Sequence, residues 1–202
     1  MKLINQLRYL VEQTEEYFVT PETASDELAT FISKDEGVGG EPVLYTYDDA
    51  YYNDPPIEYV SSRYKKGKPG GTLTIGYGHT GGEAYEGNII TKETALKLLK
   101  NDLAEAVGCV NRIINAWTGD ELEGGKIDQC MYDAMVSLVF NSGCQNVRMS
   151  PWIQDVKKGN WTEVSSAIKT WNPPQRRKKD GTWVDNYTRR EKEVELFSNC
   201  TY

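Results

Sequence analysis

The stretch "GGTLTIGYGHT", residues 70–80, contains four of the eighteen glycines of this chain and its only histidine, His79. Glycine loses more backbone freedom on folding than any other residue, so a glycine-rich stretch indicates tight turns or a close approach of the backbone to another group. The β-branched residues between the glycines favour a strand. We therefore predict a β-hairpin with its turn at 66–71.

A glycine-rich loop can also bind phosphate, but that use requires a following helix N-terminus and a lysine that reaches the phosphate. The residues that follow here, 81–90, read "GGEAYEGNII" and contain two glutamates and no lysine. The sequence therefore excludes a phosphate-binding loop and favours hairpin glycines that let the backbone approach a cleft.

Length and charge limit the function further. The 202 residues suffice for one well-cored domain, and 39% hydrophobic with 26% charged residues is ordinary for a soluble globular protein. A net charge of −7 argues against a nucleic-acid binder. No apolar run approaches the ~20 residues needed to span a bilayer, and residues 1–18 lack the continuous apolar core of a secretory signal. We expect neither stable membrane insertion nor a signal peptide.

One basic cluster interrupts this acidic chain, at 176–179 with Arg189 and Arg190 after it. It is either a local anion-facing patch or a solvated loop and helix start, and the second interpretation is favoured.

The four cysteines show no C-x-x-C spacing, and with a single histidine the chain predicts no zinc site. Cys109 and Cys130 fall within helical patterns and are expected to be buried as small apolar groups. A disulfide between Cys144 and Cys200 is possible if the protein works outside the cytosol, although sequence alone does not give the pairing.

Apolar periodicity predicts a mostly helical chain around the hairpin, in the α+β class. An amphipathic helix is expected within residues 1–20. The next helix begins at Thr20 or at Ser25 and ends at Gly37. Further helices are expected from the N-cap Thr91 to about 114, and at 127–141, 150–159, 161–171 and from 188 onward.

Glu36 is the first candidate catalytic group. It is four residues beyond Ile32 on the predicted helix, so its carboxyl is expected to face apolar surface near the helix C-terminus. Both surroundings disfavour the anion and raise a carboxyl pKa, which suits a general acid. A surface glutamate before a turn is the alternative. A second carboxylate, Asp48 or Asp49, would complete the minimum set for cleaving a glycosidic bond.

Three motifs follow one another along the chain: "SKDEG" at 33–37, "LYTYDDA" at 44–50 and "TLTIGYGHT" at 72–80. They resemble the E-G, L-x-A-Y-x-D and T-I-G-Y-G-H motifs of phage-type lysozymes, the endolysin muramidases of glycoside hydrolase family 24. The resemblance extends over about 27–198. It implies a lysozyme-like α+β fold, with a helical body and a small antiparallel sheet at the active-site cleft, and a catalytic domain at 21–202 preceded by a helical extension at 1–20.

The resemblance also implies roles for individual residues. Glu36 matches the general acid, Asp49 the second carboxylate and Thr74 the threonine that helps hold the attacking water. Asp48 and Asp54 remain rivals of Asp49.

Residues near the cleft are implied in the same way. Tyr77 and His79 lie in the matched hairpin and are expected among the substrate-binding residues at the cleft, and for His79 a structural hydrogen bond beside the acid is favoured over catalysis. Asn141 matches a position at the cleft floor, where it either binds sugar or caps the end of a helix.

Residues 50–71 depart from the family pattern as an insertion between Asp49 and Thr74. Its tyrosines, Tyr59 and Tyr64 among them, suit sugar rings, so the segment is expected either to form one wall of the substrate groove or merely to cover the sheet.

The implied function is a muramidase that cleaves the β-1,4 bond between N-acetylmuramic acid and N-acetylglucosamine of peptidoglycan, without metal or cofactor. The expected setting is host cell lysis by a monomer that stays in the host cytoplasm until a holin-type partner releases it to the cell wall. A lytic transglycosylase and a non-catalytic glycan-binding module of the same fold are the alternatives.

Overall fold

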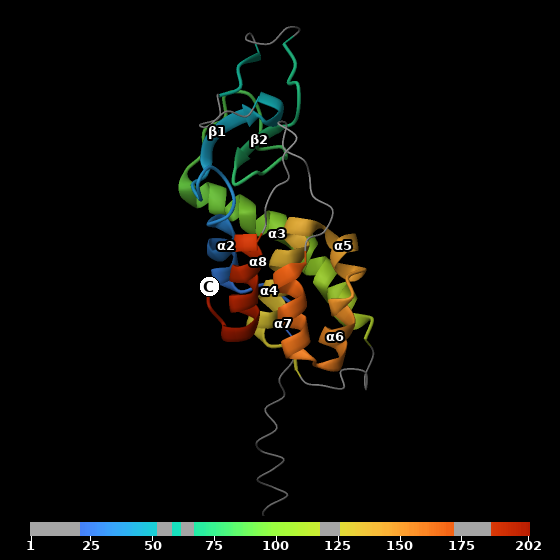
Figure 1. Cartoon of the computed structure of the whole chain (residues 1–202). Helices are drawn as coiled ribbons and strands as arrows, with labels where there is room; N and C mark the ends of the chain where they lie inside the picture. Colours follow the sequence, from blue (N-terminus) through green and yellow to red (C-terminus); the bar gives the residue numbers. More distant parts are fainter. Residues whose placement is uncertain (1–20, 52–57, 62–66, 118–125, 172–186) are drawn as a thin grey trace, which may run out of the picture.

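The computed structural model describes residues 21–51, 58–61, 67–117, 126–171 and 187–202. A small sheet lies at one end of a helical body, and the long helix α3 (Lys92–Asn115) runs from one to the other (Figure 1). The predicted helix at 1–20, the basic residues 176–179, Asp54 and Tyr64 lie outside the described residues. Within the described residues, no helix combines the length and the apolar character that a membrane crossing requires.

Helix α2 (Asp26–Ser33) begins after Ser25, the later of the two predicted starts, but it ends before Glu36. The prediction that Glu36 lies within this helix is wrong, because the chain closes into a turn in which the Glu36 amide donates to the Ser33 carbonyl. Gly37 then adopts φ +72°, and a Cβ there would collide with the carbonyl oxygen of Glu41. Only glycine fits this position, so Gly37 allows the chain to reverse its direction directly after Glu36.

The predicted hairpin is present as an antiparallel pair, β1 (Val43–Asp48) and β2 (Leu73–Gly76), with Tyr47 opposite Thr74. Single bridges add Ile89 beside Tyr45 and Glu58 beside Tyr47, so β1 has further backbone partners along its length. A 3-10 turn, η1 (Asp49–Tyr51), follows β1.

Directly after β2 the chain makes a narrow loop over residues 75–79. The Ile75 amide donates to the His79 carbonyl and the His79 amide donates to the Ile75 carbonyl, both at 2.9 Å. Gly76 and Gly78 have positive φ values, +68° and +95°, which this loop requires. The glycine-rich stretch therefore does form a hairpin, but its tight turn lies at 75–79 and not at the predicted 66–71.

Helix α3 begins as predicted, because the Thr91 side chain accepts a hydrogen bond from the Thr94 amide. One face of α3 is buried against the rest of the molecule, through Ala95, Leu98, Leu99, Leu103, Ala106, Cys109, Val110, Ile113 and Ile114. Its first part contacts β2 and its later part contacts α4 and α5, so a single rigid element fixes the sheet relative to the helical body.

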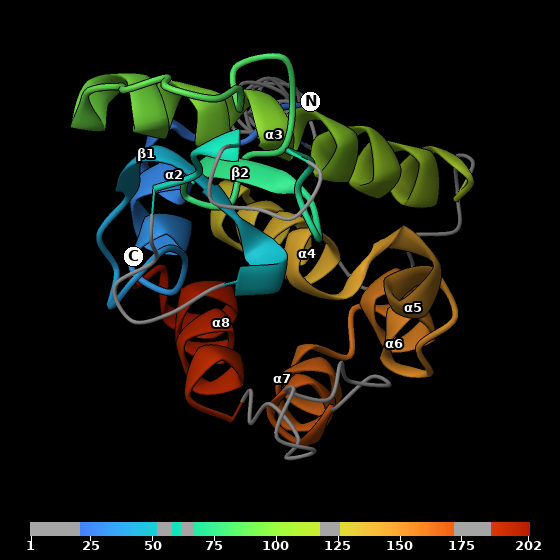
Figure 2. The same ribbon diagram turned by 90° about the horizontal axis from the view of Figure 1, so that it is seen from above.

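The helical body surrounds α4 (Gln129–Ser142), which is buried almost all round, as its apolar sequence predicts. Seen from above, α4 lies in the middle of the body, and it contacts α2, α3, α5 and α8 (Figure 2). The remaining helices are α5 (Cys144–Arg148), α6 (Trp152–Lys158), α7 (Trp161–Thr170) and α8 (Tyr187–Asn199).

Two disulfides cross-link this body. Cys109 of α3 bonds to Cys144 at the start of α5, and Cys130 of α4 bonds to Cys200 after α8, with Cα–Cα distances of 5.8 and 5.2 Å. The predicted Cys144–Cys200 pair is wrong, because α3 brings Cys109 to Cys144 while the end of the described chain returns to the first turn of α4. Cys109 and Cys130 are buried as predicted, but as disulfide sulfurs.

Candidate active site

Glu36 is held by an arginine from the other end of the chain. Nη1 of Arg189, in the first turns of α8, donates to Glu36 Oε1 at 2.7 Å, and the Glu36 side chain is 26% exposed. The apolar surroundings predicted for this carboxyl are therefore not what the structure shows. Glu36 Oε2 has no hydrogen-bond partner among the described residues.

A second carboxylate, that of Glu193, holds Arg189 in place. Its Nε donates to Glu193, and the fully buried Glu193 carboxylate also accepts hydrogen bonds from Ser137 and Arg190. Burial lowers the pKa of Arg189, but the charges of Glu193 and Glu36 and their hydrogen bonds outweigh it and raise the pKa above the ordinary value. The guanidinium stays charged and holds Glu36 in one place.

The solvated role favoured for Arg189 and Arg190 is wrong, since only 8% of Arg189 and 1% of Arg190 are exposed. The available signal was helical spacing, because Glu193 follows the two arginines at i+4 and i+3.

The structure separates the two adjacent aspartates of β1 and η1. Asp48 is buried, and its carboxylate accepts hydrogen bonds from the amides of Ala50, Gly70 and Gly71. It thus ties together the two ends of the insertion. Asp49 is exposed and accepts one hydrogen bond, from the Thr72 amide at 2.6 Å.

Thr74 and Asp49 meet at Thr72. The Thr74 hydroxyl donates to the Thr72 carbonyl at 3.2 Å, while the Thr72 amide donates to Asp49. Glu36 forms no hydrogen bond with either residue. It is linked to the hairpin through Gly37, where a Cβ would lie 3.4 Å from the ring of Tyr77.

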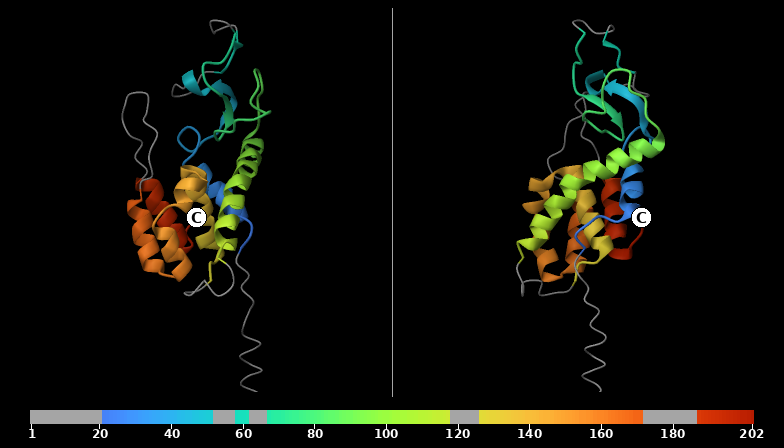
Figure 3. Two further views of the ribbon diagram at one scale, coloured as in Figure 1. Left: turned by 90° about the vertical axis from the view of Figure 1, so that its right-hand side faces the viewer. Right: turned by 180° about the vertical axis from the view of Figure 1, so that it is seen from behind.

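A cavity of about 690 Å³ lies between the loop that follows β2 and the helices α3 and α4. Figure 3 shows how α3 joins the sheet to the helical body. Tyr77 connects the cavity with the Glu36 turn, whereas Glu36, Asp49 and Thr74 are not among its lining residues. These are Tyr77, Gly78, Thr80, Asn101, Asp102, Ala104, Glu105, Ala106, Val139, Phe140, Gly143 and Cys144.

Two predicted substrate-binding residues have other partners in the structure. Asn141 Oδ1 accepts a hydrogen bond from Arg190 Nη2 at 2.7 Å, so its carbonyl oxygen is already used. Tyr59 is only 3% exposed. A buried ring offers no face to a sugar, so the burial of Tyr59 does not fit a place in the groove wall and supports the sheet-covering alternative.

His79 lies between two carboxylates. Its Nδ1 is 2.9 Å from Asp102 Oδ1 and its Nε2 is 3.0 Å from Glu83 Oε2. Both ring nitrogens are engaged, so the ring has no free nitrogen for a sugar, and the neighbouring acid is Asp102 rather than Glu36. The favoured structural role fits this arrangement and the substrate-binding role does not.

This arrangement makes stability depend on pH. Burial lowers the pKa of His79, but its hydrogen bonds to Asp102 and Glu83 and their charges outweigh burial and raise the pKa above the ordinary 6.5. The stabilisation is fully present below about 6.5 and is lost as the pH rises through the folded-state pKa. We expect His79→Gln to lower Tm by roughly 2–4 °C more at about pH 5.5 than at about pH 9. Thermal unfolding at both values checks this, and an equal decrease at both would contradict it.

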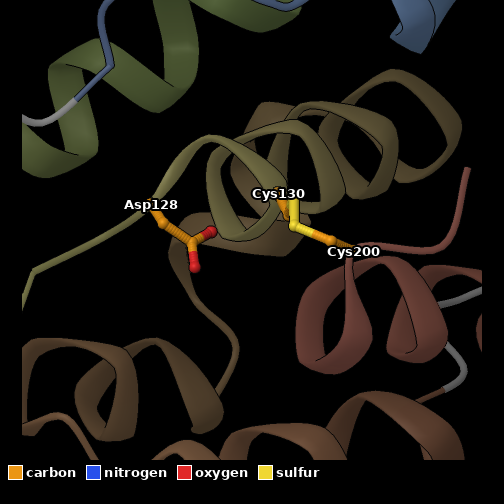
Figure 4. A group of neighbouring side chains, drawn as sticks. All are labelled: Asp128, Cys130 and Cys200. Carbon is orange, nitrogen blue, oxygen red and sulfur yellow. A yellow bond between two sulfur atoms is a disulfide. The ribbon is translucent and has the colours of Figure 1, made fainter.

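Asp128, Cys130 and Cys200 place a carboxylate and two sulfurs within 4.8 Å of one another (Figure 4). The two sulfurs form a disulfide and carry no thiolate, and the Asp128 carboxylate accepts the amide of Met131 as the N-cap of α4. A capped helix start beside a disulfide accounts for this group without a metal ion.

Comparison with known proteins gives a consistent set of relatives. The family model "Phage lysozyme" matches residues 59–193, a range that includes Thr74 and His79 but begins after Glu36 and Asp49. The endolysin of Bacillus phage B103 is 32% identical over 126 residues, which are 61% of this chain and 42% of that protein. The SAR-endolysin of Enterobacteria phage P21 is 28% identical over 126 residues, which are 62% of this chain and 68% of that protein. The chain thus spans less than half the length of the B103 endolysin.

The similarity to solved structures covers a larger share of this chain than the family model does. A variant of P22 lysozyme is 28% identical with a TM-score of 0.58, covering 87% of this chain and 97% of that one. The muramidase domain of SpmX from Asticaccaulis excentricus is 26% identical with a TM-score of 0.59, covering 88% and 98%. The fold class predicted from the motifs, a lysozyme-like helical body with a small sheet, is confirmed.

Proposed function

Because this chain belongs to the phage lysozyme family, we propose that it hydrolyses the β-1,4 bond between N-acetylmuramic acid and N-acetylglucosamine in peptidoglycan. The observation that carries the proposal is a partly exposed carboxylate, Glu36, fixed by the buried Arg189, together with a second exposed carboxylate, Asp49, which shares Thr72 with Thr74. Similarity to proteins named endolysin and SAR-endolysin supports a role for this reaction in bacterial cell lysis.

In the proposed reaction Glu36 is the general acid. Arg189 occupies Oε1 only, so Oε2 is the oxygen that carries the proton to the leaving glycosidic oxygen. Arg189 is a positioning residue, since it acts on the sugar only through Glu36.

Asp49 is the general base in this proposal. Its carboxylate is exposed and accepts one backbone hydrogen bond, which leaves acceptor positions for a water molecule. Thr74 is only 4% exposed, and its hydroxyl donates to the Thr72 carbonyl next to Asp49, which leaves its lone pairs as acceptors for the same water. The water attacks the anomeric carbon while Glu36 protonates the leaving oxygen, which is the division of labour between two carboxyls in glycoside hydrolysis.

The direct test is the release of new reducing ends from purified peptidoglycan. We expect the wild-type chain to release them continuously, and the same chain after heat denaturation to release none. Binding of peptidoglycan without release would support the glycan-binding module instead.

A further inference from the structure

The exposed side of α3 carries a row of residues that begins in the cavity beside the hairpin. Asn101, Glu105, Gly108 and Arg112 follow one another at spacings of four, three and four, which places them along one face of the helix. Asn101 and Glu105 line the 690 Å³ cavity, and Arg112 lines a second cavity of about 210 Å³. Cys144 lines both, so the two cavities adjoin along α3.

The second cavity brings two cations together in an acidic chain. Arg112 from α3 and Arg148 from α5 both line it, beside Trp117 and the Cys109–Cys144 disulfide. Within the part of the chain that the structure describes, neither guanidinium forms an ion pair or a side-chain hydrogen bond. Two like charges on one small cavity repel each other, and an anion between them removes that repulsion. A guanidinium can donate two parallel hydrogen bonds to a carboxylate, so the two groups match in geometry as well as in charge.

The first cavity offers the opposite charge. Glu105 is exposed, lines the cavity and has no ion pair among the described residues, whereas its neighbour Asp102 is occupied by His79. Seven residues separate Glu105 from Arg112, a rise of about 10 Å along the helix. Gly108 lies between them, and its missing side chain leaves room for the Arg112 guanidinium, whose Nη1 would lie 3.4 Å from a Cβ at this position.

We propose that this row, the α3 strip (Asn101, Glu105, Gly108 and Arg112, with Arg148 of α5), binds the stem peptide of peptidoglycan. Glu105 binds a stem amine and the two arginines bind a stem carboxylate. The inference rests on the proposed function, because a stem is attached to the glycan strand that occupies the cleft. An extended peptide covers about 3.3 Å per residue, so amine and carboxylate about three residues apart match the spacing of the strip.

The test compares two substrates: peptidoglycan with its stems, and glycan strands from which an amidase has removed them. We expect Glu105→Gln, Arg112→Gln and Arg148→Gln each to raise KM about tenfold on the stem-bearing substrate with kcat nearly unchanged, the mark of lost uniform binding. On stem-free strands these variants should behave like wild type. Lys97→Gln, an exposed cation of α3 outside both cavities, is the control and should change neither. All four positions are exposed, so unchanged Tm values are expected.

Other outcomes overturn the inference. Equal losses on both substrates, or no loss on either, would show that the strip does not bind stems. Losses in the arginine variants alone, with inhibition by inorganic phosphate, would indicate a general anion site instead. If the wild type cleaves neither substrate, it is the proposed function that fails. Direct binding of a free stem peptide by wild type, lost in Glu105→Gln and in Arg112→Gln, supports the strip even then.

Discussion

Replacing Glu36 with glutamine is expected to lower the rate of peptidoglycan cleavage by at least ~10²-fold, the usual contribution of a general acid. Glutamine keeps the size of the side chain, and its amide oxygen can still accept the hydrogen bond from Arg189. What it lacks is the transferable proton. The loss should therefore appear in kcat, measured as the initial rate of reducing-end release at saturating peptidoglycan.

The matched control is Glu41→Gln, in the same turn region. Glu41 is exposed and pairs with Lys92, so its replacement should leave the rate within about twofold of wild type. Both variants should keep Tm close to that of wild type. Near-normal cleavage by a folded Glu36 variant would remove Glu36 from the mechanism.

The second large effect concerns Asp49, with Asp48 as its internal comparison. Asp49→Asn is expected to lower kcat by at least ~10²-fold with little effect on stability, because the exposed carboxylate has only one backbone partner. Asp48→Asn should instead lower the stability and leave kcat nearly unchanged. Asparagine has one acceptor oxygen for three amide donors, and its NH2 group faces one of them, so we expect a loss of about 2–3 kcal/mol of stability.

Measuring kcat and Tm for both variants separates the two roles. A large loss of kcat in folded Asp48→Asn, with normal activity in Asp49→Asn, would move the base by one residue. Loss of activity in both variants at unchanged Tm would contradict the division into a structural Asp48 and a catalytic Asp49.

Local sequence signals predicted most of the architecture. Thr91 gives the start of α3 because its hydroxyl accepts from an amide three residues away, and the apolar run at 127–141 gives α4 because burial on all sides needs no particular partner. The hairpin followed in the same way from glycines and β-branched residues. These features depend on neighbours within a few residues, so the sequence displays them directly.

The unpredicted features depend on residues that are distant in the chain. Arg189 contacts Glu36 across 153 positions, and His79 contacts Asp102 across 23. The disulfide partners are 35 and 70 residues apart. Periodicity predicted which residues are buried but not which of them meet. For the same reason, the environment expected for Glu36 from its own segment differs from the ion pair that the structure shows.

The most direct test of hydrolysis is the mass of the products when purified peptidoglycan is digested in water enriched in heavy oxygen. A hydrolase with a water held by Asp49 and Thr74 leaves one heavy oxygen on each new reducing end. We expect this label on the new reducing-end muramic acid of the products. Unlabelled anhydromuramic products would show internal displacement by the sugar itself, as in a lytic transglycosylase, and would contradict this expectation.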